Sequence, residues 1–190
     1  MFKTPILALF LLCGPLAVAG CFDGGATVAA QSTPSPAFRP TATIEEIMQS
    51  IIDPAADAVW DAVVTEVTAA GTTTTQPETD GDWAGLRHEA IILIEATNLL
   101  LIEGRAVAAP ESRSELPGID LEPAEIESLL ANDRETWTRL VSGLYASGVE
   151  ILHAVDTADV DALLEAGANL DLACEACHSA YWYPELGATR

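Results

Sequence analysis

Basic residues are scarce in this chain of 190 residues. Lysine and arginine together number 8 against 29 aspartates and glutamates, which gives a formal net charge of −21. The single lysine is Lys3, so almost all positive charge comes from arginine. Because affinity for nucleic acids and anionic lipid surfaces depends on basic side chains that neutralise phosphates, this balance excludes DNA and RNA binding.

Long uncharged apolar runs are also lacking. The most apolar stretch, Pro5 to Leu12, is followed by Gly14 and Pro15, and it is well short of the roughly 20 residues that a membrane-spanning helix needs. Nevertheless 49% of the residues are hydrophobic and only 19% are charged, which excludes wholesale disorder. The length suits one compact domain with appendages.

The N-terminal segment has the pattern of an export signal, with Lys3, an apolar stretch and then small residues. Val18-Ala19-Gly20-Cys21 resembles the lipobox of bacterial lipoproteins, which implies a signal peptide over 1–20 and lipidation of Cys21. The alternative is plain cleavage after Ala19, which leaves Cys21 as an ordinary thiol. In both cases the protein leaves the cytoplasm, and we expect it in the periplasm, lipid-anchored to a bacterial membrane.

Residues 21–42 are rich in Gly, Ala, Ser, Thr and Pro, which predicts a flexible tether. After it, apolar residues recur every three or four positions and predict helices over 43–69, 83–104, 123–155 and from about 157 or 159 past the last cysteines. Pro54 should kink the first of these, 71–82 should be a loop, and no strand is expected. The fold predicted for 43–184 is all-α, an antiparallel four-helix bundle, followed by a tail over 185–190.

The strongest motif is Cys174-Glu175-Ala176-Cys177-His178, a C-x-x-C-H run of the kind that attaches c-type haem. Two cysteines three positions apart on a helix share one face, so both thiols can add to the vinyl groups of one porphyrin. The imidazole that follows can then ligate the iron. The motif therefore predicts one covalently attached haem c.

Three alternatives to haem remain open. Cys174 and Cys177 could bind zinc together with His88 and His153 from other helices. The two cysteines could form a redox-active pair, although such pairs usually occur in αβ folds. They could also form a local disulfide, which would add little stability because it closes a very short loop. With Cys13 in the leader and Cys21 the lipid candidate, haem attachment leaves no cysteine without a role.

A haem-attachment motif near the C-terminus, on the last helix of a four-helix bundle, resembles the cytochrome c′ family. The resemblance covers about 43–184 and implies thioethers at Cys174 and Cys177 and axial ligation by His178. It also implies a possible homodimer through the first two helices. In that family the first helix crosses the opposite face of the haem. Some members place an apolar residue there, which leaves the iron open to NO or CO, and others place a methionine there and carry electrons.

Met48 lies on the apolar side of the first predicted helix, where the methionine-ligated members carry their ligand. Apart from the initiator it is the only methionine, so it is a candidate sixth ligand, the alternative being a core side chain. No catalytic acid, base or nucleophile set is apparent. We therefore expect a non-enzymatic monohaem cytochrome that transfers single electrons to redox partners with basic docking surfaces. The rivals are a five-coordinate NO- or CO-binding protein and a non-haem bundle with a metal or disulfide at Cys174 and Cys177.

One departure from the family concerns the residues after the motif. Members commonly carry an aromatic and then a basic residue there, whereas 179–184 supplies aromatics and no base. The haem propionates would need another partner, for which Arg87, Arg105 and Arg139 are candidates. Tyr181 and Trp182 would cover the haem edge. We expect Trp60 and Trp137 in the core or in the wall of the haem site.

Overall fold

A computed structural model describes residues 38–184 of the chain. The chain divides into two units, Met1–Ala37 and Phe38–Arg190, and only the second contains described residues. The predicted signal peptide over 1–20, the lipidation site Cys21, most of the 21–42 tether and the tail over 185–190 therefore lie outside the described residues. Within 38–184, no helix is both long enough and apolar enough to cross a membrane.

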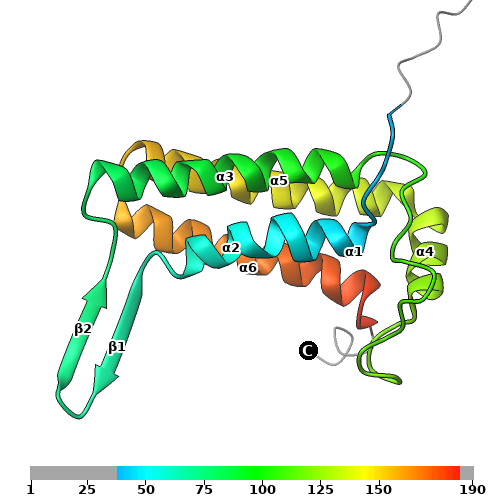
Figure 1. Ribbon diagram of the computed structural model, residues 1–190, viewed down its shortest axis with the longest axis horizontal. Coiled ribbons are helices and arrows are strands. Elements are labelled where there is room, and N and C mark those ends of the chain that lie inside the picture. Colours follow the sequence, from blue (N-terminus) through cyan, green and yellow to red (C-terminus); the bar gives the residue numbers. More distant parts are fainter. Residues whose placement is uncertain (1–37, 185–190) are drawn as a thin grey trace, which may run out of the picture. The chain divides into compact units, whose positions relative to one another are not determined.

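The described unit is mostly helical, as the sequence predicts, with one small sheet (Figure 1). In chain order the elements are α1 (Ile44–Ile47), the π-helical turn η1 (Met48–Ile52), α2 (Asp53–Trp60), β1 (Val64–Thr68), β2 (Gly71–Thr75), α3 (Asp80–Leu100), α4 (Pro123–Asn132), α5 (Arg134–Asp156) and α6 (Val160–Tyr181).

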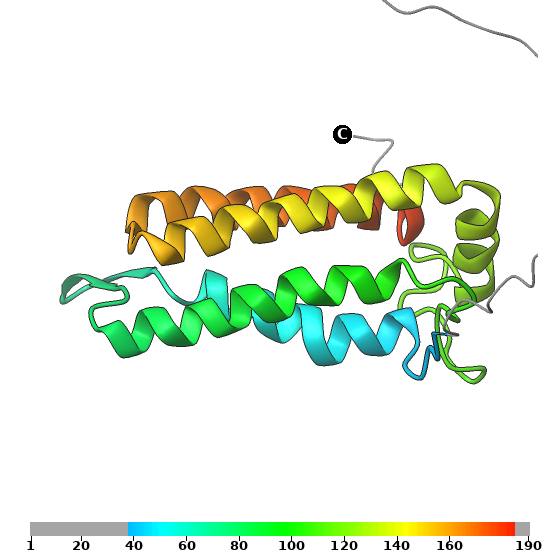
Figure 2. The same ribbon diagram turned by 90° about the horizontal axis from the view of Figure 1, so that it is seen from above.

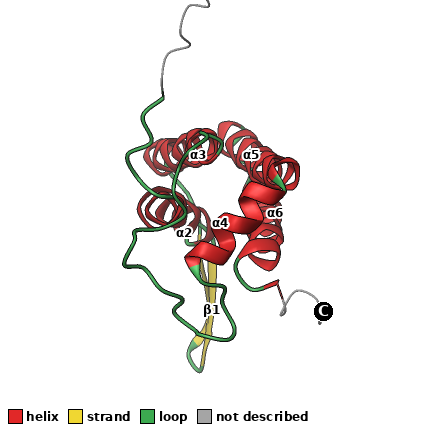
Figure 3. Ribbon diagram, turned by 90° about the vertical axis from the view of Figure 1, so that its right-hand side faces the viewer, coloured by secondary structure: helices red, strands yellow, loops and turns green. Residues whose placement is uncertain are grey.

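Four helical segments pack around one apolar core. Helix α5 lies against α3 and α6, and α2 lies against the same two helices (Figure 2). Seen end-on, α2, α3, α5 and α6 surround a common centre, and α4 crosses one end (Figure 3). Side chains that are at most 1% exposed fill the centre: Leu93, Val141, Ile151, Leu163 and Leu170. Burial of these aliphatic faces is the main force holding the helices together.

The helix starts follow local capping chemistry. The predicted capping box at Thr43 is confirmed: the Glu46 amide donates to Thr43 Oγ1 at 3.1 Å, and Glu46 Oε2 accepts from the Thr43 amide at 2.8 Å. Asp159 likewise caps α6, accepting from the Ala162 amide at 3.0 Å. Thr79 and Asp82 form a second capping box, so α3 begins at Asp80, three residues before the predicted start.

The kink expected at Pro54 takes the form of a π-helical turn. The Asp53 amide donates to the Met48 carbonyl, five residues back, where an α-helix would use four. Proline has no N–H to offer and its ring would clash with the carbonyl of Ser50 in a regular helix. The wider turn relieves this clash and lets the chain continue into α2. Met48 is the first residue of this turn.

The prediction that the first helix runs to residue 69 is wrong. The helix ends at Trp60, and a hairpin of β1 and β2 follows, with Val64 paired to Thr75 and Thr68 paired to Gly71. The predictions of a loop over 71–82 and of no strands are also wrong, because β2 covers Gly71–Thr75. The segment is rich in valine and threonine, whose β-branched side chains favour strands over helix. Every residue of the two strands is exposed.

The third predicted helix is two helices. The run over 123–155 breaks at Asp133, whose backbone leaves the helical region with φ −137° and ψ 67°. The Asp133 side chain accepts from the Thr136 amide at 2.9 Å and so caps α5. The second predicted helix ends at Leu100 instead of residue 104, and the connection over 101–122 that follows it contains no helix. Its Leu121 amide donates to the Trp182 carbonyl at 2.8 Å, which ties the connection to the end of α6.

Candidate functional site

A cavity of about 390 Å³ lies between the first helical segment, α6 and the connection over 101–122. This volume falls within the range of about 300–1,000 Å³ that is usual for cofactor and small-molecule sites. Its apolar walls come from Ile44, Met48, Val107, Leu121, Ile126, Leu130, Trp137 and Tyr181. Its polar lining includes Glu45, Gln49, Asp53, Arg113, Ser114, Glu115 and His178. A mostly apolar hollow with a few polar groups is typical of a binding site.

The C-x-x-C-H motif lies in the last turns of α6. Cys177 and His178 line the cavity, and Cys177 is buried whereas His178 is half-buried. Cys174 is half-buried one turn earlier, where it packs at the edge of the core rather than lining the cavity. Both cysteines are free thiols. One helical turn separates them, so they share a face of α6, as the spacing predicts.

Met48 lines the same cavity from η1. The sequence separates Met48 from His178 by 130 positions, and the packing of the first helical segment near α6 brings both side chains to one hollow. Met48 is only partly buried, unlike its neighbour Ile47, which is 1% exposed. Its side chain packs against the core and also borders the cavity.

Burial keeps both thiols protonated. It raises the pKa of Cys174 to about 12, with further contributions from the nearby Cys177, Asp171 and Asp53. Burial also raises the pKa of Cys177 to about 11, against the opposing effect of Arg139. Redox-active cysteine pairs have lowered pKa values, and zinc binding needs thiolates. Burial therefore holds both groups as neutral thiols near neutral pH.

His178 and Asp53 influence each other's pKa. Burial lowers the pKa of His178, while the carboxylates of Asp53 and Glu175 act in the opposite direction. Partial burial raises the pKa of Asp53, and the nearby His178 opposes this shift. Near neutral pH the imidazole is thus held in its neutral form, which is the form that ligates a metal. The arrangement suits His178 as a ligand.

Aromatic rings surround the motif. Trp137 and Tyr181, which are 4% and 7% exposed, meet edge to face at a centroid distance of 5.5 Å in the cavity wall. This confirms Trp137 as a core and wall residue. The rings of Trp182 and Tyr183 lie 5.0 and 6.0 Å from that of His178. Trp182 lines the cavity and is also 38% exposed.

The arginine that lines the cavity is one that sequence reasoning missed. Arg87 instead pairs with Asp156 at 2.8 Å, and Arg105 donates to the carbonyls of Leu99 and Ala42. Neither these nor Arg139 lines the cavity, whereas Arg113 does. No local signal marks Arg113, because it belongs to the aperiodic connection over 101–122. Only the path of that connection along the cavity assigns it to the site.

The two other histidines lie away from the cavity. His88 on α3 and His153 on α5 are exposed and are not cavity residues. Over 38–184, no three or more His, Cys, Asp or Glu side chains are grouped to hold a metal ion. The tetrahedral zinc site with Cys174 and Cys177 therefore has no support in this part of the chain.

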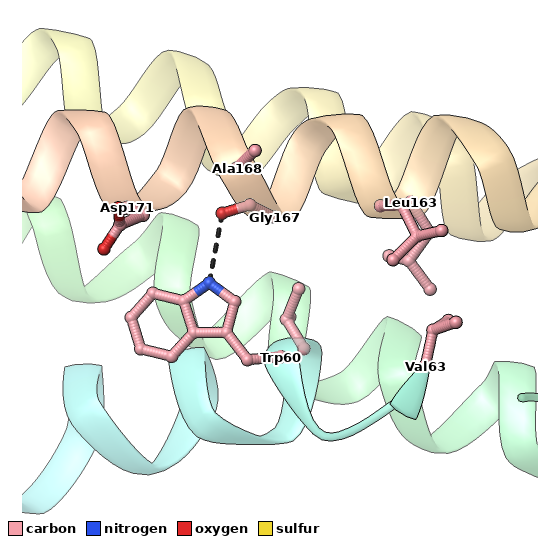
Figure 4. Close-up of a pocket in the computed structure, with 8 residues that line it drawn as sticks. Trp60, Val63, Leu163, Gly167, Ala168 and Asp171 are labelled. Carbon is pink, nitrogen blue, oxygen red and sulfur yellow. Dashed lines mark hydrogen bonds between the residues drawn. The ribbon is translucent and has the colours of Figure 1, made fainter. Parts of the chain in front are cut away.

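A second hollow, of about 350 Å³, lies between α2 and α6 (Figure 4). Trp60 borders it, 40% exposed, and its indole N–H donates to the Gly167 carbonyl at 3.0 Å. The remaining lining is aliphatic apart from Asp171. The expectation that Trp60 lies in the core or the haem wall is therefore wrong, because its ring is 40% exposed and lies against Gly167 of α6, outside the larger cavity. We name this hollow the Trp60 groove.

The side chains at and beside the larger cavity are of the kinds that a c-type haem needs. The imidazole of His178 could supply one axial ligand and the thioether of Met48 a second. Cys177 in the cavity wall and Cys174 one turn earlier would supply the thiols for attachment, and the aliphatic and aromatic walls suit the faces of a porphyrin. Such a site needs no cluster of three protein ligands, because the porphyrin nitrogens complete the coordination of the metal.

Comparison of the chain with protein-family models, with curated proteins and with solved structures finds no match.

Proposed function

We propose that this protein is an exported monohaem c-type cytochrome of the cytochrome c′ type that carries single electrons. The observation that carries the proposal is that Met48, Cys177 and His178, distant in the sequence, line one apolar cavity. A bound haem would supply the reversible one-electron chemistry of its iron. The chain's part is to attach the group, hold it between apolar walls and set its potential through ligation, burial and nearby charge.

The packing of the helices supports the family assignment. In an antiparallel four-helix bundle of the cytochrome c′ kind, the haem motif lies on the last helix and the first helix faces the other side of the haem. Here α6 carries the motif, and the segment α1–η1–α2 takes the place of the first helix. We propose that α2, α3, α5 and α6 form this bundle and that the hairpin of β1 and β2 is an addition to it.

We propose Met48 as the sixth ligand of the iron. Its placement at the cavity, partly exposed, supports ligation over a filling role in the core, for which a methionine would be fully enclosed. The rival function, a five-coordinate site for NO or CO, differs in this one bond. The same cavity would then hold the gas. The spin state of the iron separates the two functions, because two strong axial ligands give a low-spin spectrum.

The compartment and the partners belong to the same proposal. Covalent haem attachment takes place outside the cytoplasm, which agrees with an export signal over 1–20 and a lipid on Cys21. A net charge of −21 favours redox partners with basic docking surfaces. A homodimer through the first two helices would follow from the family resemblance. The alternative is a non-haem bundle with a metal or disulfide at Cys174 and Cys177, which are free thiols in the structure.

The direct test is to express the full chain in a bacterial host that matures c-type cytochromes and to examine the purified protein. We expect a mass that exceeds the processed polypeptide by one haem, together with a pyridine haemochrome spectrum of the c type. We also expect a low-spin ferrous spectrum with slow or weak CO binding. A polypeptide without covalent haem would overturn the proposal, and a high-spin, CO-binding spectrum would favour the gas-binding function.

A further inference from the structure

Among the aromatic side chains that line the cavity, Trp182 alone reaches the surface. Trp137 and Tyr181 are enclosed, whereas 38% of Trp182 is exposed. Its ring meets the His178 ring edge to face, with centroids 5.0 Å apart. The same side chain therefore contacts the proposed axial ligand, borders the cavity and touches solvent.

The position of Trp182 is fixed by the fold. Its amide donates to the His178 carbonyl at 2.8 Å, and its own carbonyl accepts from the Leu121 amide at 2.8 Å. The neighbouring Tyr183 packs against it with centroids 5.5 Å apart and donates its hydroxyl to Glu175 Oε2 at 2.8 Å. These contacts hold the pair of rings against the end of α6.

The surface beside these rings is acidic. Positive charge near the motif includes Arg113, which lines the cavity, and Arg139 of α5, which acts on Cys177, whereas the sequence contains no lysine or arginine between Arg39 and Arg87 or between Arg139 and Arg190. These stretches include α2 and α6, which lie side by side (Figure 1). The carboxylates that act electrostatically on Cys174 and His178 are Asp53, Asp171 and Glu175, and Asp57 acts in turn on Asp53; all four come from these two helices.

We propose that Trp182 is the contact through which electrons pass between this protein and a basic one-electron carrier protein, which docks over Trp182 and the acidic α2–α6 surface. This inference rests on the proposed function. One electron passes from the reduced protein by way of His178 and Trp182 to the oxidised carrier, which is thereby reduced. No bond forms or breaks and no proton moves. An exposed aromatic ring supplies close apolar contact at the centre, and the surrounding carboxylates steer a basic partner into place.

The test measures the second-order rate of electron transfer from the reduced holoprotein to a lysine-rich cytochrome c. We expect Trp182→Leu to lower the rate constant about tenfold, the effect typical of removing a central aromatic from an interface. Trp182→Phe should restore much of it. Tyr145→Leu is the matched control, because Tyr145 is 44% exposed on α5 and lines neither the cavity nor the Trp60 groove. The absorption spectrum and midpoint potential of each variant show whether the haem environment is intact.

Two double variants test how much the surface carboxylates contribute to the rate. Asp57→Asn with Asp171→Asn should lower the rate at low salt several-fold, whereas Glu95→Gln with Glu135→Gln, exposed on α3 and α5, should not. The wild-type rate should fall as ionic strength rises, since salt screens exposed charges. A Trp182→Leu variant with normal haem and a normal rate would overturn this inference alone. An equal effect of Tyr145→Leu, or a rate that does not fall with salt, would also overturn it. Absence of covalent haem would overturn the proposed function and this inference with it.

Discussion

The cavity at His178 and the Trp60 groove are alike in size and unlike in chemistry. Their volumes are about 390 and 350 Å³, and each has a tryptophan that is about two-fifths exposed. The cavity brings together a thioether, a thiol, an imidazole and an arginine from three separate parts of the chain. The groove is lined by α2, α6 and Val63 alone, with Asp171 as its one charged residue.

The comparison shows that volume does not identify a functional site. In the groove the indole N–H of Trp60 donates to the backbone carbonyl of Gly167, so this donor is already paired within the fold. In the cavity the imidazole of His178 and the thioether of Met48 border open space. Groups that can ligate a metal and that line a hollow are available to a ligand, and this is the difference on which the function depends.

The largest difference between the cavity and the groove should appear when the attachment thiols are removed. We expect Cys174→Ala with Cys177→Ala to abolish covalent haem completely, because no other cysteine lies in the described residues. Intact mass and haem staining after denaturing electrophoresis measure the loss. Leu164→Ala at the Trp60 groove should leave attachment unchanged. Haem that stays covalently bound in the double variant would contradict the assignment of the motif.

A smaller change tests the sixth ligand. With Met48→Ala we expect the spectrum to change from low spin to high spin and CO to bind readily, because an axial position is opened. Absorption spectra with and without CO record the effect. Ile51→Ala, in the same π turn but outside the cavity lining, should keep the low-spin spectrum. If the spectrum of Met48→Ala matches the wild type, Met48 is a core side chain and no ligand.

The smallest expected effect comes from a substitution in the Trp60 groove. Trp60→Phe removes the donor to the Gly167 carbonyl and should lower the free energy of unfolding by about 1 kcal/mol, with haem content and spectrum unchanged. Urea denaturation followed by circular dichroism measures the difference. Tyr145→Phe, at an exposed site on α5, should change stability by less than about 0.5 kcal/mol. Loss of haem in Trp60→Phe would mean that the groove is part of the site.

Much of the helical fold was predictable because its signals are local. The capping residues Thr43 and Asp159 mark helix starts that the structure confirms. The helix end at Trp60 was not predicted, because the apolar spacing continues through Val63 and Val67 while their β-branched shape and the threonines beyond favour strands. The break at Asp133 was missed for a similar reason, since one capping side chain divides an otherwise continuous apolar face.

The spacing of apolar residues in the sequence indicates the π turn. Ile47, Ile51, Ala55 and Val59 recur every four residues, a longer period than the 3.6 residues of an α-helix. A regular helix would rotate this set gradually away from the core. A turn with an extra residue compensates, so the partly or fully buried side chains before and after Pro54 stay on the inner side.

Residues 174–178 determined by themselves which chemistry the last helix offers, because two thiols and an imidazole within five positions have their relative geometry set by one helix. Which groups meet that motif was decided by tertiary structure. Met48, Arg113 and Trp182 reach the same cavity through a π turn, an aperiodic connection and a helix end. Contacts between segments far apart in the chain depend on how whole helices pack, and no short stretch of sequence carries that information.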